Sequence, residues 1–70
     1  MSRAVVEEMI AQQQQKLLTV ARKIIPHVTL EDLLQPQDYP ELDFDPEFRY
    51  QEGVLYGLET VLIAIRATEK

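Results

Sequence analysis

The chain has 70 residues, no cysteine and a formal net charge of −5. A chain this short forms one domain at most, and the free energy gained by burying its apolar groups only about balances the entropy lost on folding. Without cysteine, disulfides and thiolate metal ligands cannot contribute. We therefore expect a single helical domain over residues 1–70 that depends on close helix packing or on association with another chain.

The negative charge is concentrated in the middle of the sequence. Residues 27–52 hold eight acids and one arginine, whereas residues 1–26 are weakly basic and residues 53–70 are neutral. An acidic protein is poorly suited to binding nucleic acid or an anionic membrane surface. The longest apolar run, Val61–Ile65, is far shorter than the roughly 20 residues of a membrane span. The sequence therefore predicts a cytoplasmic protein without nucleic-acid or membrane partners.

The first predicted element is a long helix over about residues 3–25. Its apolar residues recur at spacings of three, four and seven, which is typical of one buried helix face. Ser2 is a suitable N-cap, and Pro26 ends the pattern because the residue before a proline disfavours helical geometry. Gln13 and Gln14 interrupt the apolar stripe, so we expect weaker packing in the first half of this helix.

A short helix and a loop are predicted next. Thr29 and Asp32 form a variant of the capping box, which predicts a helix over about residues 30–34. Pro36 and Pro40 then favour a loop over residues 35–45. Leu42 and Phe44 alternate with acids, so their side chains should face the same way. We expect the two phenylalanines, Phe44 and Phe48, to fill the core at this end of the molecule.

The last predicted element is a long helix over about residues 46–68. Asp45 is a suitable N-cap, and Pro46 occupies the first helical position, where proline is favoured. Two long helices joined through a short one predict an all-α fold, namely an antiparallel helical hairpin. The last helix is apolar over more than half of its circumference, which a single neighbouring helix cannot cover.

The uncovered surface predicts association, most simply a homodimer that forms a four-helix bundle. Gly53 and Gly57 lie four residues apart, which indicates a close approach of another helix, either the first helix or one from a second copy. The candidate protein interface is formed by six residues of the last helix: Val54, Gly57, Leu58, Val61, Leu62 and Ile65.

Residues for catalysis or metal binding are scarce. The only serine is Ser2 and the only histidine is His27, so the common nucleophile and base pairs cannot be assembled. We interpret His27 as an exposed turn residue rather than a metal ligand or a pH-sensitive hinge. The run from Asp43 to Glu47 resembles the opening of a calcium loop, but the glycine and glutamate that such a loop needs later are missing. We therefore expect no catalytic, cofactor or metal site.

These features favour a non-catalytic protein-interaction module, such as an adaptor, a chaperone-like protein or a regulator. A second candidate partner surface combines acids and aromatics of the loop region, although a solvated loop explains the same residues: Tyr39, Glu41, Asp43 and Tyr50. The alternative is a small enzyme or ligand-binding subunit whose site, with Glu52, Glu59 and Tyr56, forms between copies. A third hypothesis is a structural dimer whose acidic loop mimics nucleic acid.

Overall fold

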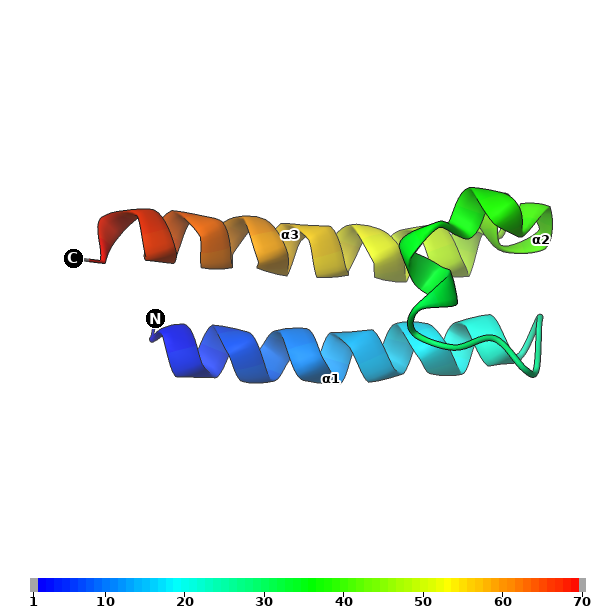
Figure 1. Ribbon diagram of the computed structural model, residues 1–70, viewed down its shortest axis with the longest axis horizontal. Coiled ribbons are helices and arrows are strands. Elements are labelled where there is room, and N and C mark those ends of the chain that lie inside the picture. The colour runs from blue at the N-terminus through cyan, green and yellow to red at the C-terminus, as the bar shows by residue number, and fades with distance from the viewer. Residues whose placement is uncertain (1, 70) are drawn as a thin grey trace.

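The structure, a computed structural model, describes residues 2–69 and is a helical hairpin (Figure 1). Two long helices, α1 (Arg3–Arg22) and α3 (Pro46–Thr68), run antiparallel and pack against each other. The connector between them contains two 3₁₀ turns, η1 (Asp32–Leu34) and η2 (Pro36–Asp38), and one short helix, α2 (Pro40–Asp43). No strand occurs within residues 2–69. The predicted all-α hairpin is confirmed, whereas the dimer stays a prediction.

Both long helices begin at the residues that the sequence indicated. The Ser2 hydroxyl accepts a hydrogen bond from the Val5 amide at 3.2 Å. An Asp45 carboxylate oxygen accepts one from the Phe48 amide at 2.8 Å, and Pro46 follows the cap as the first helical residue. Each cap satisfies an amide that has no partner inside its helix, which explains why these two boundaries were readable from sequence.

Helix α1 ends at Arg22, three residues before the predicted end. The amides of Lys23 and Ile24 donate to the carbonyls of Val20 and Ala21, so the last turn tightens to 3₁₀ geometry before Pro26 is reached. The Arg22 Nε then donates to the Val28 carbonyl at 3.0 Å, which holds the chain as it reverses. The C-terminal boundary was therefore less predictable than the N-terminal one.

The connector is more ordered than predicted. The capping box is present, because the Thr29 amide donates to Asp32 Oδ2 at 3.0 Å and the Asp32 amide to Thr29 Oγ1 at 3.3 Å. However, the expected short helix is only the 3₁₀ turn η1. The expected loop over residues 35–45 is also wrong in part, since Pro36 begins η2 and Pro40 begins α2. At both positions proline occupies the first helical residue, where its missing amide costs nothing.

The helical turn of α2 separates Leu42 from Phe44. Leu42 is fully buried, whereas Phe44 is 82% exposed. The prediction that both side chains face one way assumed an extended strand, and the helical geometry makes it wrong. Phe48 is fully buried and Phe44 is not, so the prediction of two core phenylalanines is confirmed for Phe48 alone.

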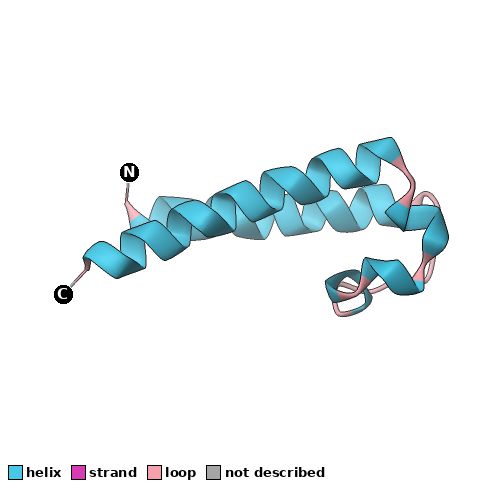
Figure 2. Cartoon of the chain, turned by 90° about the horizontal axis from the view of Figure 1, so that it is seen from above, coloured by secondary structure: helices cyan, strands magenta, loops and turns pink. Residues whose placement is uncertain are grey.

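The hydrophobic core lies at the end of the hairpin that holds the connector. We call this end the connector end, and the opposite end, where residues 2 and 69 lie, the terminal end. Seen from above, the connector covers one side of the helix pair at the connector end only (Figure 2). Ten apolar residues form the core there: Leu17, Leu18, Val20, Ala21, Ile25, Val28, Leu33, Leu42, Phe48 and Leu55.

The terminal end has little buried apolar surface. Val6 is the one fully buried apolar residue in the first ten described positions of α1, and no described residue of α3 after Leu55 is buried. Between the two ends, Gln13 Nε2 donates to Gln51 Oε1 at 2.8 Å and to the Gln51 carbonyl at 3.0 Å, with both glutamines buried. This polar pair separates the tight core from the loosely covered helices.

Candidate functional site

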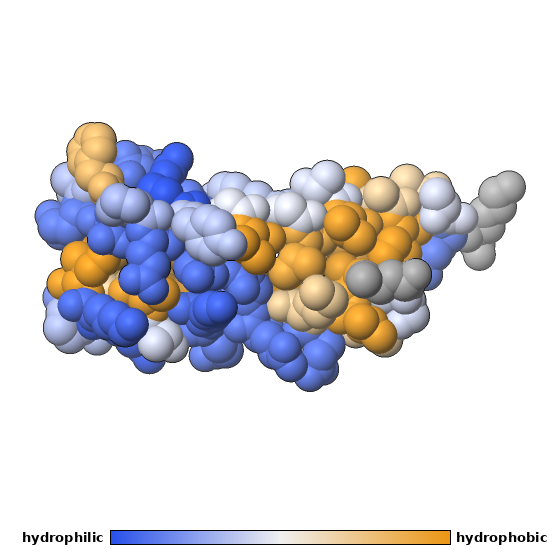
Figure 3. Space-filling view, turned by 180° about the vertical axis from the view of Figure 1, so that it is seen from behind, coloured by the Kyte–Doolittle hydropathy of each residue, from blue (hydrophilic) through white to orange (hydrophobic). Residues whose placement is uncertain are grey.

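The first candidate site is an apolar surface on the side of the helix pair opposite the connector. Figure 3 shows apolar side chains gathered over the terminal end on this side, while hydrophilic side chains dominate the connector end. We call this surface the rear face. Its members come from both long helices: Val5 and Met9 from α1, and Val54, Leu58, Val61 and Ile65 from α3.

The six predicted interface residues lie on or beside the rear face. Val54, Gly57 and Val61 are exposed, and Val61 exposes 43% of its surface. The other three, Leu58, Leu62 and Ile65, are half-buried against α1. A single copy therefore leaves this side of α3 incompletely covered, as the breadth of its apolar pattern indicated.

The contribution of α1 to the rear face was missed. Val5 is 50% exposed and Met9 is also exposed, and Met9 borders a shallow hollow that Val54 and Leu58 also line. The available signal was the spacing of Val5 and Met9, four residues apart and adjacent to the main stripe. That spacing places both side chains on one face of a helix.

The glycines of α3 have no packing role within one copy. Beyond the adjoining residues of α3 itself, a Cβ atom built on Gly53 or Gly57 would meet no atom of residues 2–69 within 4 Å, so close contact with α1 is excluded as their explanation. Glycine inside a helix costs about 1 kcal/mol relative to alanine. Between Gly53 and Ile65 the only charged residue is Glu59. Within this stretch, the side of the helix that carries Val54, Gly57 and Val61 is thus exposed, apolar and uncharged.

The second candidate site is a groove between the connector and the two long helices, on the side opposite the rear face. Its volume is about 300 Å³. Five leucines line it, and we call it the leucine groove: Leu17, Leu30, Leu33, Leu34 and Leu55. Glu31, Glu52 and Glu59 lie at the same groove, together with Gln14 and Tyr56, and none of the basic residues in the described chain lines it.

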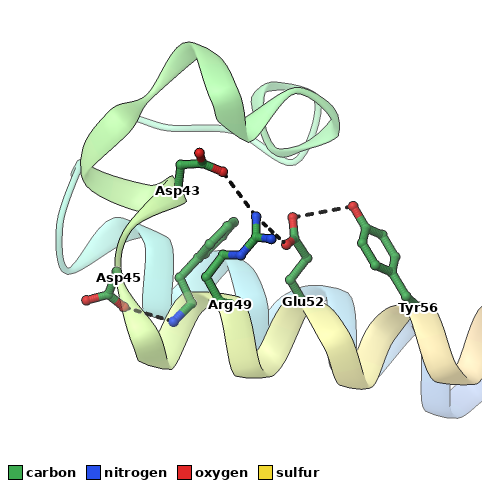
Figure 4. A network of polar contacts seen from close by, with 6 residues as sticks. Asp43, Asp45, Arg49, Glu52 and Tyr56 are labelled. Atoms are coloured by element: carbon green, nitrogen blue, oxygen red, sulfur yellow. Dashed lines mark hydrogen bonds and ion pairs between the residues drawn. The ribbon is translucent and has the colours of Figure 1, made fainter.

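A polar network runs along one edge of the leucine groove (Figure 4). Arg49 Nη1 lies 3.0 Å from Asp43 Oδ1 and 3.2 Å from Glu52 Oε1. The Tyr56 hydroxyl points to Glu52 Oε2 at 3.4 Å. Partial burial and the nearby Glu52 carboxylate raise the pKa of Tyr56 above its ordinary value. The network fixes the buried Glu52 and connects α3 to the end of α2.

The predicted acidic and aromatic partner surface is divided in the structure. Glu41 and Tyr50 are exposed, whereas Tyr39 is half-buried against the core. Burial and the carboxylates of Asp32 and Asp38 raise the pKa of Tyr39. Asp43 forms the ion pair with Arg49 described above. Two of the four residues are therefore engaged within the chain, and only the other two are freely presented.

The residues of the alternative hypothesis lie together within one copy. Glu52, Tyr56 and Glu59 all line the leucine groove, so a second copy is not required to assemble them. His27 is exposed in the turn after α1. Across residues 2–69 no three histidine or acidic side chains are arranged to hold a metal ion.

Comparison with protein-family models, curated proteins and solved structures finds no match to this chain. Among the helices of residues 2–69, none combines the length and the hydropathy needed to cross a bilayer. The rear face and the leucine groove are the two surfaces of this fold that offer exposed apolar side chains to a partner.

Proposed function

We propose that this chain is a non-catalytic helical interaction module that associates through its rear face, first with a second copy of itself. The observation that carries the proposal is the exposed apolar and uncharged surface of α3 beside the exposed Val5 and Met9 of α1. Large exposed apolar patches on small proteins mark interaction surfaces. Two hairpins packed rear face to rear face form a four-helix bundle.

The size of the molecule is consistent with this assembly. The described chain measures 41 × 19 × 17 Å, so its whole broad side, of which the rear face is the terminal part, approaches the area of about 800 Å² per partner that stable interfaces bury. A two-fold axis would bring the same apolar residues of each copy together. Gly57, at the edge of the rear face, would let the two α3 helices approach closely.

The test is the molar mass in solution, measured by light scattering coupled to size exclusion. Wild-type protein should show about twice the mass of one 8.1 kDa chain. Val61→Glu should be a folded monomer, because Val61 is exposed in a single copy and a charge there disrupts only an intermolecular contact.

Ile63→Glu is the matched control. Ile63 is 66% exposed on the same helix, but two residues along a helix turn the side chain about 200° around the axis, away from the rear face. This variant should remain a dimer with unchanged circular dichroism. A monomeric wild type at all concentrations, or equal loss of association in both variants, would contradict the proposal.

A further inference from the structure

The leucine groove has chemistry that the rear face lacks. The connector presents three leucines within one turn, but only Leu33 is buried in the core. Leu34 is 78% exposed and Leu30 is also exposed, and both line the groove. Leaving two leucines beside a concave surface costs hydrophobic stabilisation. The connector therefore supplies one wall of a groove whose apolar lining is not covered by the chain itself.

The charge at this groove has one sign. Arg49 neutralises Glu52, but Glu31 and Glu59 form no ion pair among residues 2–69. Both carboxylates lie beside apolar side chains and face the same groove. A ligand that complements this surface has a bulky apolar group and one or two positive charges close to it. Nucleic acid and acidic peptides carry the wrong charge for it.

We propose that the leucine groove binds an amphipathic segment of a partner protein, in which leucine-like side chains are flanked by lysine or arginine. A volume of about 300 Å³ lies at the lower limit of small-molecule pockets, which span about 300–1,000 Å³. It suits the side chains of one face of a peptide helix. This proposal rests on the proposed interaction function and adds the chemistry of the partner protein. It does not require the dimer.

The groove and the rear face lie on opposite sides of the helix pair. The connector that forms the groove wall covers one side (Figure 2), and the rear face lies on the other (Figure 3). Peptide binding and self-association should therefore be compatible. A dimer would present two grooves outward, which increases the avidity for a partner that carries two such segments.

The experiment measures binding of a fluorescent synthetic helical peptide with leucines on one face and lysines beside them, by anisotropy. Wild-type protein should bind it and should not bind the same peptide with every lysine replaced by glutamate. Glu31→Gln/Glu59→Gln should weaken binding, roughly fivefold for each charge if each exposed ion pair contributes near the upper end of its usual range. Leu34→Ser should weaken binding as well.

Glu8→Gln/Glu47→Gln is the matched control, since it makes the same change in net charge at exposed acids outside the groove. Its affinity should equal that of the wild type. Equal weakening in both double variants, equal binding of both peptides, or no binding at all would overturn the groove assignment. Val61→Glu separates the two proposals, because a monomeric variant that still binds the peptide supports the groove independently of the dimer. Loss of binding in Val61→Glu alone would place the peptide on the rear face.

Discussion

At the connector end, three layers of chain surround the core, whereas at the terminal end only two helices face each other. The capping box, η1 and α2 place Leu33 and Leu42 over α1 and α3, and Phe48 completes a closed core. The terminal end has comparable apolar content in α3 but, within residues 2–69, no third element, so Val61 and Ile63 stay exposed. Two helices alone cannot enclose a broad apolar surface.

This difference shows that apolar composition does not by itself produce a core. The covering element decides which residues are buried, and here it is an acidic, proline-containing connector that covers only half of the hairpin. The connector end should carry most of the stability of an isolated copy, and the terminal end should contribute fully only when something packs on it. The following predictions test that division.

The largest effect is expected for Phe48→Ala at the connector end. Removing a buried phenylalanine costs about 3–5 kcal/mol, a large part of the roughly 4–10 kcal/mol available to a domain of this size. Leu62→Ala, at a half-buried site of the terminal end, should cost about 1–2 kcal/mol, less than half of the value for Phe48→Ala. Chemical denaturation followed by circular dichroism measures both. Equal losses of unfolding free energy in the two variants would contradict the proposal that the connector end carries most of the stability.

The glutamine pair at the boundary should have the next largest effect. Gln13→Ala leaves the buried Gln51 side chain without its partner, which should cost about 1–3 kcal/mol. Adding Gln51→Ala removes the orphaned group as well. The double variant should therefore lose less than the sum of the two single variants, in a double-mutant cycle of unfolding free energies. Additive losses would show that the two side chains act independently.

Asp45→Ala should destabilise the start of α3 by about 1 kcal/mol, the usual value of an N-cap. The matched variant Asp45→Asn retains an oxygen that accepts from the Phe48 amide and should lose much less. The midpoint of denaturation measures the difference. A loss of the same size in both variants would mean that charge, rather than capping, is responsible.

In an isolated copy, Gly57→Ala should slightly raise the free energy of unfolding, whereas the substitutions described above lower it. The added Cβ meets open space, so helix propensity should raise the unfolding free energy by up to about 1 kcal/mol. In the proposed dimer the same methyl group would hinder helix approach. Light scattering at several concentrations should then show weaker association of a more stable chain, and unchanged association would place Gly57 outside the interface.

The smallest effect is expected at high pH. Because the pKa of Tyr56 is raised in the folded chain, the unfolded chain ionises first, at a pKa near 10.0. The stability that this difference in pKa gives the folded chain is fully present below pH 10.0. It is lost as the pH rises through the pKa of Tyr56 in the folded chain. Tyrosinate absorbance should show a late-ionising component that is reduced in Tyr56→Phe. Its persistence in that variant would assign it to Tyr39, whose pKa is also raised.

The sequence predicted those parts of the fold that depend on local chemistry. Ser2, Asp45, Pro46 and the Thr29–Asp32 box each act within three residues, so both helix starts and the connector turn could be located. The structure of residues 36–43 was not predicted, because prolines that end one element also begin the next. Phe44 was misplaced since its exposure depends on the helical geometry of α2.

The candidate sites were predictable to different extents. The excess apolar surface of α3 was visible as periodicity, but the addition of Val5 and Met9 depends on how α1 is rotated against it. The leucine groove was not predictable, because Leu30 and Leu34 meet Leu55 only once the connector has folded back. The spacing of apolar residues along the sequence predicts which face of a helix is apolar. A groove between segments that are distant in sequence can be predicted only when their tertiary arrangement is known.

The antiparallel hairpin has a practical consequence for handling the protein. Arg3 Nη1 lies 3.2 Å from Glu69 Oε1, so residues near both extremities of the described chain are neighbours (Figure 1). A purification tag or fluorescent reporter attached close to Arg3 or Glu69 would lie at the terminal end, and its bulk would compete with any chain that docks there. Labels that report assembly faithfully belong at the far tip, for example at the exposed His27.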